Sequence, residues 1–498
     1  MNVNPITRLD YPDPDVIRVE DTYYMVSTTM HFMPGCEILQ SFDLVHWEHV
    51  TYVYETLDHT DAQQLKSGQN IYGQGMWAAS LRYHEGRFYI CFVANDTRKT
   101  YLYTSEKIDG PWEKQLIEGF YHDGSLLFDE DGRNYIVYGN DEIWITELNE
   151  DLTAPKKDGL HRLLVSDHKN PELGYEGSHI QKINGYYYIF LIHSLRDRWM
   201  RTEACFYSDS LEGEFTGGDV LCDDRGYCGQ GVAQGGIVDT PDGKWYAMLF
   251  QDSGAVGRIP ILLPVTWKDH FPVFGQNGHV PEEIEVHSTR PGYIYQPLVG
   301  SDDFCNGLLP RWQFNHDPDP RYYHLDALQG TYTITTREVC TELTQAVNTL
   351  TQRMSYPSCA AEVTVDASAL KEGDVAGLCA LQGCYAAVGI TKHHGKYEVL
   401  MLDKKEDGIL DMTEGTVVES HQMDFRLEAD FCNMKDEARC YYRVNKGDWL
   451  PIGTVHKLYF KLDHFTGCRF GLFCYAAEET GGSACFRDFK YYDVDEIS

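Results

Sequence analysis

Basic residues are scarce in this chain, and their scarcity excludes two broad functions. The 498 residues include 42 lysines and arginines against 76 aspartates and glutamates, which gives a formal net charge of −34. Proteins that bind nucleic acid need clustered lysine and arginine for the phosphates. An anionic membrane surface attracts the same residues. We therefore expect neither nucleic acid nor a membrane among the partners of this protein.

Long apolar runs and closely paired cysteines are also missing. No stretch of 18 apolar residues occurs, so the sequence predicts no membrane-spanning helix. The 15 cysteines include no Cys-x-x-Cys pair, which argues against a zinc site or a thioredoxin-like dithiol. The opening MNVNPITRLDYPDPD has neither the cationic nor the apolar segment of a secretory signal. Together with free thiols, these features predict a cytoplasmic protein.

Aromatic residues, in contrast, are abundant and gather in short runs. The chain has 34 tyrosines and 22 phenylalanines, and runs such as RFYICFVAN, NYIVYG and YYYIFLI lie between turns rich in Gly, Asp and Asn. Such runs are typical of β-strands. Few stretches show the 3.6-residue period of a helix, so we expect an all-β fold.

One hairpin pattern recurs through the first half of the chain. Four turn glycines each follow an Asp, Glu or Asn and precede an aromatic residue: Gly86, Gly132, Gly185 and Gly243. A fifth copy, at the N-terminus, turns at Glu20-Asp21. The spacing leaves room for two further strands in each copy. Five such four-stranded units predict a five-bladed β-propeller over residues 1–298.

The repeat also brings five chemically interesting residues into register. Nine residues before the four glycines stand Trp77, Asp123, Glu176 and Gln234, and Asp13 stands nine residues before Thr22, which follows the N-terminal turn. Because the first strand of each propeller blade lines the axis, these side chains should face one mouth of the channel. Converging carboxyl groups raise each other's pKa, and an acid beside an ionised base is what cleavage of a glycosidic bond needs. A hard cation such as calcium is the alternative use of such a cluster.

At this point the chain resembles glycoside hydrolase family 43, in the branch of β-xylosidases and α-L-arabinofuranosidases with a C-terminal concanavalin-like β-sandwich. The motifs that carry the resemblance are YPDPD, SFDLVHW, GMWAASL, HDGSLLFDEDG, YEGSHIQKINGYYY and GQGVAQGGIVDTPDGKWY. They are specific in combination, and the similarity covers nearly the whole length.

The resemblance implies roles for the three acids. Asp13 would be the general base that activates water, Glu176 the general acid, and Asp123 the third carboxylate, which tunes the pKa of the acid and orients the substrate. The family inverts configuration, so the base and acid carboxyls should stand about 6.5–9.5 Å apart. Asp15 is the rival for the base because it lies on the same side of the strand. We interpret Asp15 and His179 as structural residues.

The resemblance also implies a substrate pocket around the acids. Trp77 would stack on the sugar, Phe32 and Met33 would lie where the family has an aromatic wall, and Arg258 would reach the sugar hydroxyls or the acids. Gln234 stands where many relatives have a histidine that faces a metal or water, so we expect it to donate hydrogen bonds instead. The resemblance implies no required cofactor. A structural calcium bound by the acid cluster would be the alternative, but nothing in the sequence indicates one.

After about residue 300 the repeat ends and strands alternate with Gly, Asp and Asn turns. This pattern predicts a β-sandwich of the jelly-roll, concanavalin-like kind over residues 302–498. Such a domain could be a carbohydrate-binding module, or it could close one end of the pocket as in relatives, which would restrict the enzyme to terminal sugars. Relatives of this branch often form dimers or tetramers, so a homo-oligomer is expected here too.

The leading hypothesis is thus an exo-acting, inverting hydrolase that releases β-1,4-linked xylose from short xylo-oligosaccharides. One alternative is an α-L-arabinofuranosidase that removes terminal arabinose. The other is a propeller that binds sugar without cleaving it.

Overall fold

Almost every regular element of the protein is a β-strand, as the sequence predicts. The computed structural model describes residues 4–413 and 415–493. Its helices in these ranges are single 3₁₀ turns: η1 (Lys66–Gly68), η2 (Leu343–Gln345) and η3 (Cys432–Met434). Within the described residues no helix has the length and apolar character needed to cross a membrane.

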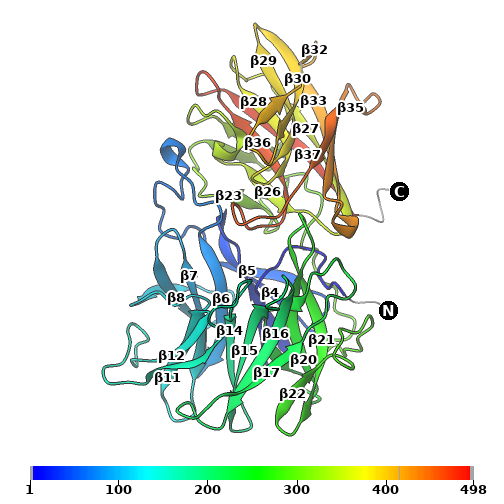
Figure 1. The fold of residues 1–498 in the computed structure, drawn as a ribbon. Coiled ribbons are helices and arrows are strands. Elements are labelled where there is room, and N and C mark those ends of the chain that lie inside the picture. The colour runs from blue at the N-terminus through cyan, green and yellow to red at the C-terminus, as the bar shows by residue number, and fades with distance from the viewer. Residues whose placement is uncertain (1–3, 414, 494–498) are drawn as a thin grey trace.

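The first half of the chain is a five-bladed β-propeller, which confirms the prediction (Figure 1). Blades one to three consist of β1 (Asp15–Val19), β2 (Thr22–Ser27), β4 (Gly35–Ser41) and β5 (Glu48–Tyr54); β6 (Met76–His84), β7 (Arg87–Ala94), β8 (Lys99–Ser105) and β9 (Glu113–Ile117); and β10 (Ser125–Phe128), β11 (Asn134–Asn140), β12 (Glu142–Leu148) and β13 (His161–Ser166). Blades four and five consist of β14 (Glu176–Ile183), β15 (Tyr186–Ser194), β16 (Arg201–Ser208) and β17 (Thr216–Leu221); and β18 (Val232–Ala233), β19 (Ile237–Asp239), β20 (Trp245–Asp252), β21 (Arg258–Lys268) and β22 (Phe271–Phe274).

The turn glycines join the two innermost strands of a blade, as expected. In blade two His84 pairs with Arg87, which leaves Glu85 and Gly86 as a two-residue turn, and Gly86 has φ +79°. In blade four Ile183 pairs with Tyr186 around an equivalent turn. Two-residue hairpins need a positive φ, which glycine adopts without strain.

One arginine ties the inner strands of four blades together. Arg82 of β6 pairs with Asp15 of blade one at 2.8 Å. Its guanidinium also donates to the carbonyl oxygens of Leu126 in blade three, at 2.8 Å, and of Ile180 in blade four, at 3.2 Å. These contacts fix the angular spacing of the blades and hence the positions of the residues at the mouth.

The second half of the chain is a concanavalin-like β-sandwich of two sheets (Figure 1). The nine-stranded sheet contains β3 (Phe32–Met33), β23 (Gln313–Asn315), β26 (Leu350–Arg353), β36 (Arg469–Tyr475), β28 (Val375–Leu381), β29 (Ala386–His393), β30 (Lys396–Lys404), β31 (Leu410–Met412) and β32 (Thr416–Val418). The seven-stranded sheet contains β24 (Tyr323–Asp326), β25 (Thr331–Thr335), β37 (Ser483–Asp493), β27 (Ser358–Asp366), β33 (Gln422–Asp430), β34 (Glu437–Val444) and β35 (Leu450–Lys457). Apolar side chains from both sheets, among them Leu378 and Phe425, form the core between them.

The two domains share a sheet, which the sequence did not indicate. Strand β3 leaves the first propeller blade and pairs with β23, with Met33 opposite Phe314 and Phe32 opposite Asn315. The predicted boundaries at residues 298 and 302 fall in the connection between β22 and β23. The outermost residues of both predicted domains, 1–3 and 494–498, lie outside the described ranges.

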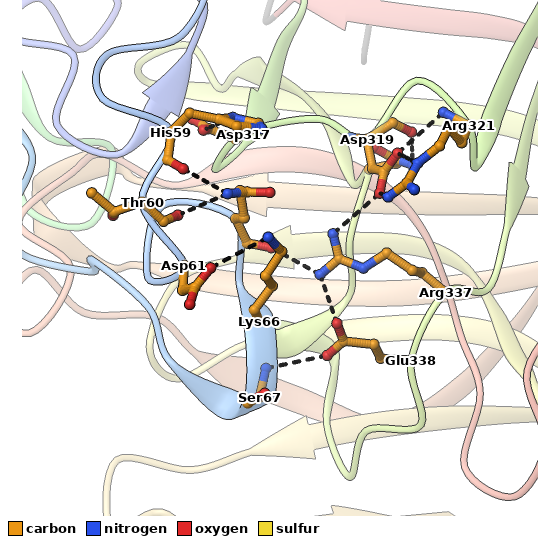
Figure 2. A network of polar contacts seen from close by, with 12 residues as sticks. His59, Thr60, Asp61, Lys66, Ser67, Asp317, Asp319, Arg321, Arg337 and Glu338 are labelled. Atoms are coloured by element: carbon orange, nitrogen blue, oxygen red, sulfur yellow. Dashed lines mark hydrogen bonds and ion pairs between the residues drawn. The ribbon is translucent and has the colours of Figure 1, made fainter.

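Polar contacts also cross the domain interface. Arg353 of the sandwich forms an ion pair of 2.8 Å with Glu37 of the propeller, and both side chains are almost fully buried. Figure 2 shows a second group of contacts, between the propeller segment 59–67 and the sandwich. There His59 contacts Asp317 at 2.7 Å, and Arg337 donates to the carbonyl oxygen of Gln64 at 2.9 Å. The sandwich is therefore docked rigidly enough to form part of a site on the propeller.

Candidate active site

The five residues of the repeat meet at one end of the propeller. Asp13, Trp77, Asp123, Glu176 and Gln234 all line the same cavity of about 640 Å³. Each lies within or next to the inner strand of its blade, so the blade symmetry alone brings them together. The prediction that these five side chains meet at one mouth of the channel is therefore confirmed.

Asp13 is held firmly beside β1. Its Oδ1 lies 2.9 Å from Nη1 of Arg258, and its Oδ2 accepts a hydrogen bond of 2.6 Å from Thr28 Oγ1. The backbone of Asp13 has φ +53°, a conformation that non-glycine residues rarely adopt. Strain of this kind gathers at functional sites, where the surrounding contacts maintain it.

Asp15, the rival for the base, faces the propeller core instead. It is 1% exposed, and it contacts Arg82 at 2.8 Å and His179 at 3.1 Å. The charge of Arg82 and the contacts from His179 outweigh the effect of burial and lower the pKa of Asp15. Asp15 and His179 therefore lie outside the cavity lining and hold inner strands together.

Glu176 and Asp123 face each other across the boundary between blades three and four. Oε2 of Glu176 accepts a hydrogen bond of 2.8 Å from Asn140 Nδ2. Oδ2 of Asp123 accepts one of 3.0 Å from the backbone N–H of Gly177. Nε2 of His122 lies 3.4 Å from Glu176 and 3.5 Å from Asp123, so the imidazole bridges the two carboxylates.

The charges of this group influence one another strongly. Burial lowers the pKa of His122, but Asp123 and Glu176 outweigh burial and raise it to about 9. Burial is the largest cause that raises the pKa of Asp123, to about 6; the charge of His122 opposes it, and Glu176 and Asp13 add to it. The expectation that convergence raises the pKa of at least one carboxyl therefore holds for Asp123. His122 and Asn140 were missed in the sequence, although His122 directly precedes Asp123.

Arg258 and Trp77 form one wall of the cavity together with a loop from the sandwich. The guanidinium of Arg258 lies 4.1 Å from the ring centroid of Phe465, and the Trp77 ring lies 5.6 Å from the same phenylalanine. Within the described residues, Nε of Arg258 and Nε1 of Trp77 are buried without a hydrogen-bond partner. Unpartnered donors beside an aromatic face suit a ligand that presents both hydroxyl groups and C–H groups.

The sandwich loop that closes the cavity could not be chosen from sequence. It lies between β35 and β36 and contributes Phe460, Lys461, Leu462 and Phe465. The backbone of Gly467 anchors the far end of this loop by donating to Asp10 Oδ2 at 2.7 Å. The second domain therefore supplies part of the site.

Gln234 is positioned by a buried acid. Its backbone N–H donates to Oε2 of Glu203 at 2.7 Å, and its own φ is +62°. Burial raises the pKa of Glu203 well above its usual value, which favours the neutral form. The side chain of Gln234 packs against Gly177, next to Glu176.

Phe32 and Met33 do not form the expected wall, and this prediction is wrong. Both are 1% exposed, because β3 is enclosed in the sandwich sheet. Arg469 stacks on the Phe32 ring at 3.4 Å, which seals it from the cavity. Phe460 and Phe465 of the sandwich supply the aromatic wall instead.

The residues that could hold a metal ion coincide with the acid cluster. Ligand atoms of His122, Asp123 and Glu176 lie within 4.8 Å of one another. The two carboxylates raise the pKa of His122 to about 9, so a cation bound there would have to displace the proton of the imidazole.

Comparison with known proteins agrees with this arrangement. The model of glycosyl hydrolases family 43 matches residues 3–272, and that of the beta xylosidase C-terminal concanavalin A-like domain matches residues 301–492. A β-xylosidase of Formosa agariphila is 27% identical over 99% of this chain and 89% of its own length. A xylosidase/arabinosidase of Butyrivibrio fibrisolvens is 24% identical over 99% of both proteins.

A solved structure shows a closer likeness. The protein described as a bifunctional GH43-CE of Bacteroides eggerthii matches 98% of this chain with a TM-score of 0.92 and 42% identity. The present chain spans 63% of the length of that protein.

Proposed function

Because this chain belongs to glycosyl hydrolase family 43 and is a glycoside hydrolase, we propose that it releases terminal β-1,4-linked xylose from short xylo-oligosaccharides with inversion. The observation that carries the proposal is the convergence of Asp13, Asp123 and Glu176 on one cavity that the sandwich partly closes.

In the proposed reaction Asp13 takes a proton from a water molecule while the water oxygen attacks the anomeric carbon. Glu176 gives its proton to the glycosidic oxygen, which leaves as the hydroxyl of the shortened sugar. This reaction inverts the anomeric centre in one displacement, and it needs a separation of about 6.5–9.5 Å between the two carboxyls. The contacts of Asp13 with Arg258 and Thr28 support its role, because they hold both carboxyl oxygens in a fixed orientation at the cavity.

Asp123 would tune the acidity of Glu176, and His122 would help to orient the acid. A negative charge on Asp123 opposes ionisation of its neighbour, while the hydrogen bond from Gly177 fixes the orientation of Asp123. Asn140 and His122 hold the Glu176 carboxyl in place. Trp77 would stack on the terminal sugar, and Arg258 and Gln234 would donate to its hydroxyl groups.

Two further features of the proposal follow from the chemistry. Acid–base hydrolysis needs no metal, so activity should survive exhaustive chelation with EDTA. The free thiols favour a reducing compartment, and we propose the cytoplasm as the site of action, with imported oligosaccharides as substrates. A homo-oligomer stays a prediction, which size-exclusion chromatography with light scattering checks.

The second candidate is an α-L-arabinofuranosidase, which the name of the Butyrivibrio fibrisolvens relative supports. The deciding experiment compares the nitrophenyl β-D-xylopyranoside with the nitrophenyl α-L-arabinofuranoside and uses Asp13→Asn as the blank, because cleavage of either substrate needs an activated water. The proposal expects preferential cleavage of the xyloside. Preferential cleavage of the arabinoside would establish the second candidate, and turnover of neither would overturn both.

A further inference from the structure

The cavity extends beyond the acid cluster to an exposed tryptophan. Trp199 lines the cavity, and yet 44% of its surface is exposed. It lies on the hairpin between β15 and β16, next to Arg201, the first residue of β16. A large aromatic ring at the rim of a cavity offers a flat apolar face to a ligand.

The position of Trp199 relative to Glu176 indicates which part of a substrate would reach it. Glu176 begins β14 in blade four and pairs with Ile192, while Ser194 pairs with Arg201 at the end of the same hairpin. Trp199 and Glu176 therefore lie at the same end of the same blade. If Glu176 is the acid of the proposed function, the leaving group departs on its side, toward blade four.

Buried charged residues support the ring of Trp199. The Arg201 guanidinium lies 5.2 Å from the Trp199 ring, and Arg201 Nε is 2.7 Å from Oδ2 of Asp252 in blade five. Arg201 is only 7% exposed, so this pair is an internal support for the ring. In the described part of the chain, Oδ1 of Asp252 is buried without a hydrogen-bond partner, although Asp252 lines the cavity. An unpaired acceptor of this kind suits a sugar hydroxyl.

The sandwich also contributes an exposed apolar group to the cavity lining, on the side of blade two. Leu462 lines the cavity from the closing loop and is 70% exposed. The exposed ring of Trp199, close to the buried carboxylate of Asp252, offers the mixed surface that a pyranose ring prefers. Its C–H face packs on the aromatic ring while its hydroxyls bond to polar groups.

We propose that Trp199, supported by Arg201 and Asp252, forms a subsite that binds the leaving-group sugar of the oligosaccharide. The subsite selects chains longer than one sugar, and it acts on substrate binding rather than on proton transfer. This inference rests on the proposed function, because Glu176 defines the leaving-group side.

The test compares two substrates that differ only in the leaving group. β-1,4-Xylotriose places sugars in the subsite, whereas β-D-xylosyl fluoride leaves it empty. Trp199→Ala should lower kcat/KM for xylotriose about tenfold, mainly through KM, and should change the value for the fluoride less than twofold. Trp199→Phe keeps an aromatic ring and should restore most of the loss. Tyr83→Ala removes an aromatic residue that is 45% exposed and absent from the cavity lining, and should alter neither value.

Equal losses on both substrates would show a structural role for Trp199 and overturn the subsite. Unchanged kinetics of Trp199→Ala on xylotriose would overturn it as well. A wild-type enzyme that cleaves neither xylotriose nor the fluoride would instead overturn the proposed function, so the two failures are distinguishable.

Discussion

The activities of Glu176→Gln and Asp13→Asn should depend on the leaving group of the substrate in different ways. A nitrophenol leaves without a proton, so Glu176→Gln should retain much of the activity on nitrophenyl glycosides while losing about 10²–10⁴-fold on xylobiose. Asp13→Asn should lose activity on both substrates alike, because both need an activated water. Steady-state kinetics of the two variants on the two substrates checks this.

Asp15 provides the control for this assignment. Asp15→Asn weakens the contact with Arg82 and should lower stability more than turnover. If folded Asp13→Asn keeps full activity while folded Asp15→Asn loses it, then Asp15 is the base and the assignment is wrong.

His122 should make the stability of the protein depend on pH. Its pKa is raised to about 9 in the folded chain, against about 6.5 in the unfolded chain. Between these values the folded state binds about one proton more, so the free energy of unfolding falls as pH rises from about 6.5 to 9. In His122→Gln the free energy of unfolding should depend less steeply on pH, by the amount that corresponds to about one bound proton. Chemical denaturation at a series of pH values would show this. An unchanged slope would mean that His122 is neutral.

At the residue scale the sequence located the five residues at the mouth because blade symmetry repeats them. The prediction for Phe32 and Met33 failed because both residues are buried in a strand that pairs with β23, far along the chain. Trp199 gave no signal at all, since it lies in a hairpin outside the repeat.

The start of strand β14 is the element on which the acid depends most closely. Gly177 follows Glu176 with φ +65°, and a Cβ there would meet the side chain of Gln234 at 2.7 Å. Gly177→Ala should therefore displace Glu176 and lower kcat about 100-fold, because a shift of about 1 Å suffices for such a loss. Gly86→Ala is the matched control: its φ is +79°, but nothing lies within 4 Å of an added Cβ.

The control variant should lose stability through backbone strain, at about 1 kcal/mol, and keep its kcat. Equal kcat values for the two variants would show that the geometry next to Glu176 is less demanding than we infer. Circular dichroism would confirm that both variants are folded.

Elements with local signals were predictable, and elements with long-range partners were not. The hairpins of the blades follow from turn residues next to each other in sequence. The closing loop between β35 and β36 has no such pattern, because its position depends on contacts such as that of Gly467 with Asp10.

At the scale of the whole molecule, the two domains should unfold together. The ion pair of Arg353 with Glu37 is buried at their interface, and removal of one partner leaves an unpaired buried charge. Glu37→Gln should lower the free energy of unfolding by about 3 kcal/mol and broaden or split the thermal transition. Arg290→Gln breaks a pair with Asp21 whose side chains are nearly half exposed, and should cost less than about 1 kcal/mol.

Differential scanning calorimetry of these variants checks the prediction. A wild-type protein with two well-separated transitions would contradict it, because the shared sheet and the buried pair should couple the domains. The architecture of two domains was predictable from the change in repeat pattern, but their coupling was not, since it depends on strand β3.

The central claim is that this enzyme cleaves terminal sugars by a single inverting displacement between Asp13 and Glu176. Proton NMR of xylotriose hydrolysis tests the claim most directly, because it identifies both the size and the anomeric form of the first product. We predict that the first products are free xylose, initially as the α-anomer, and xylobiose. Xylose that appears first as the β-anomer would contradict the proposed mechanism.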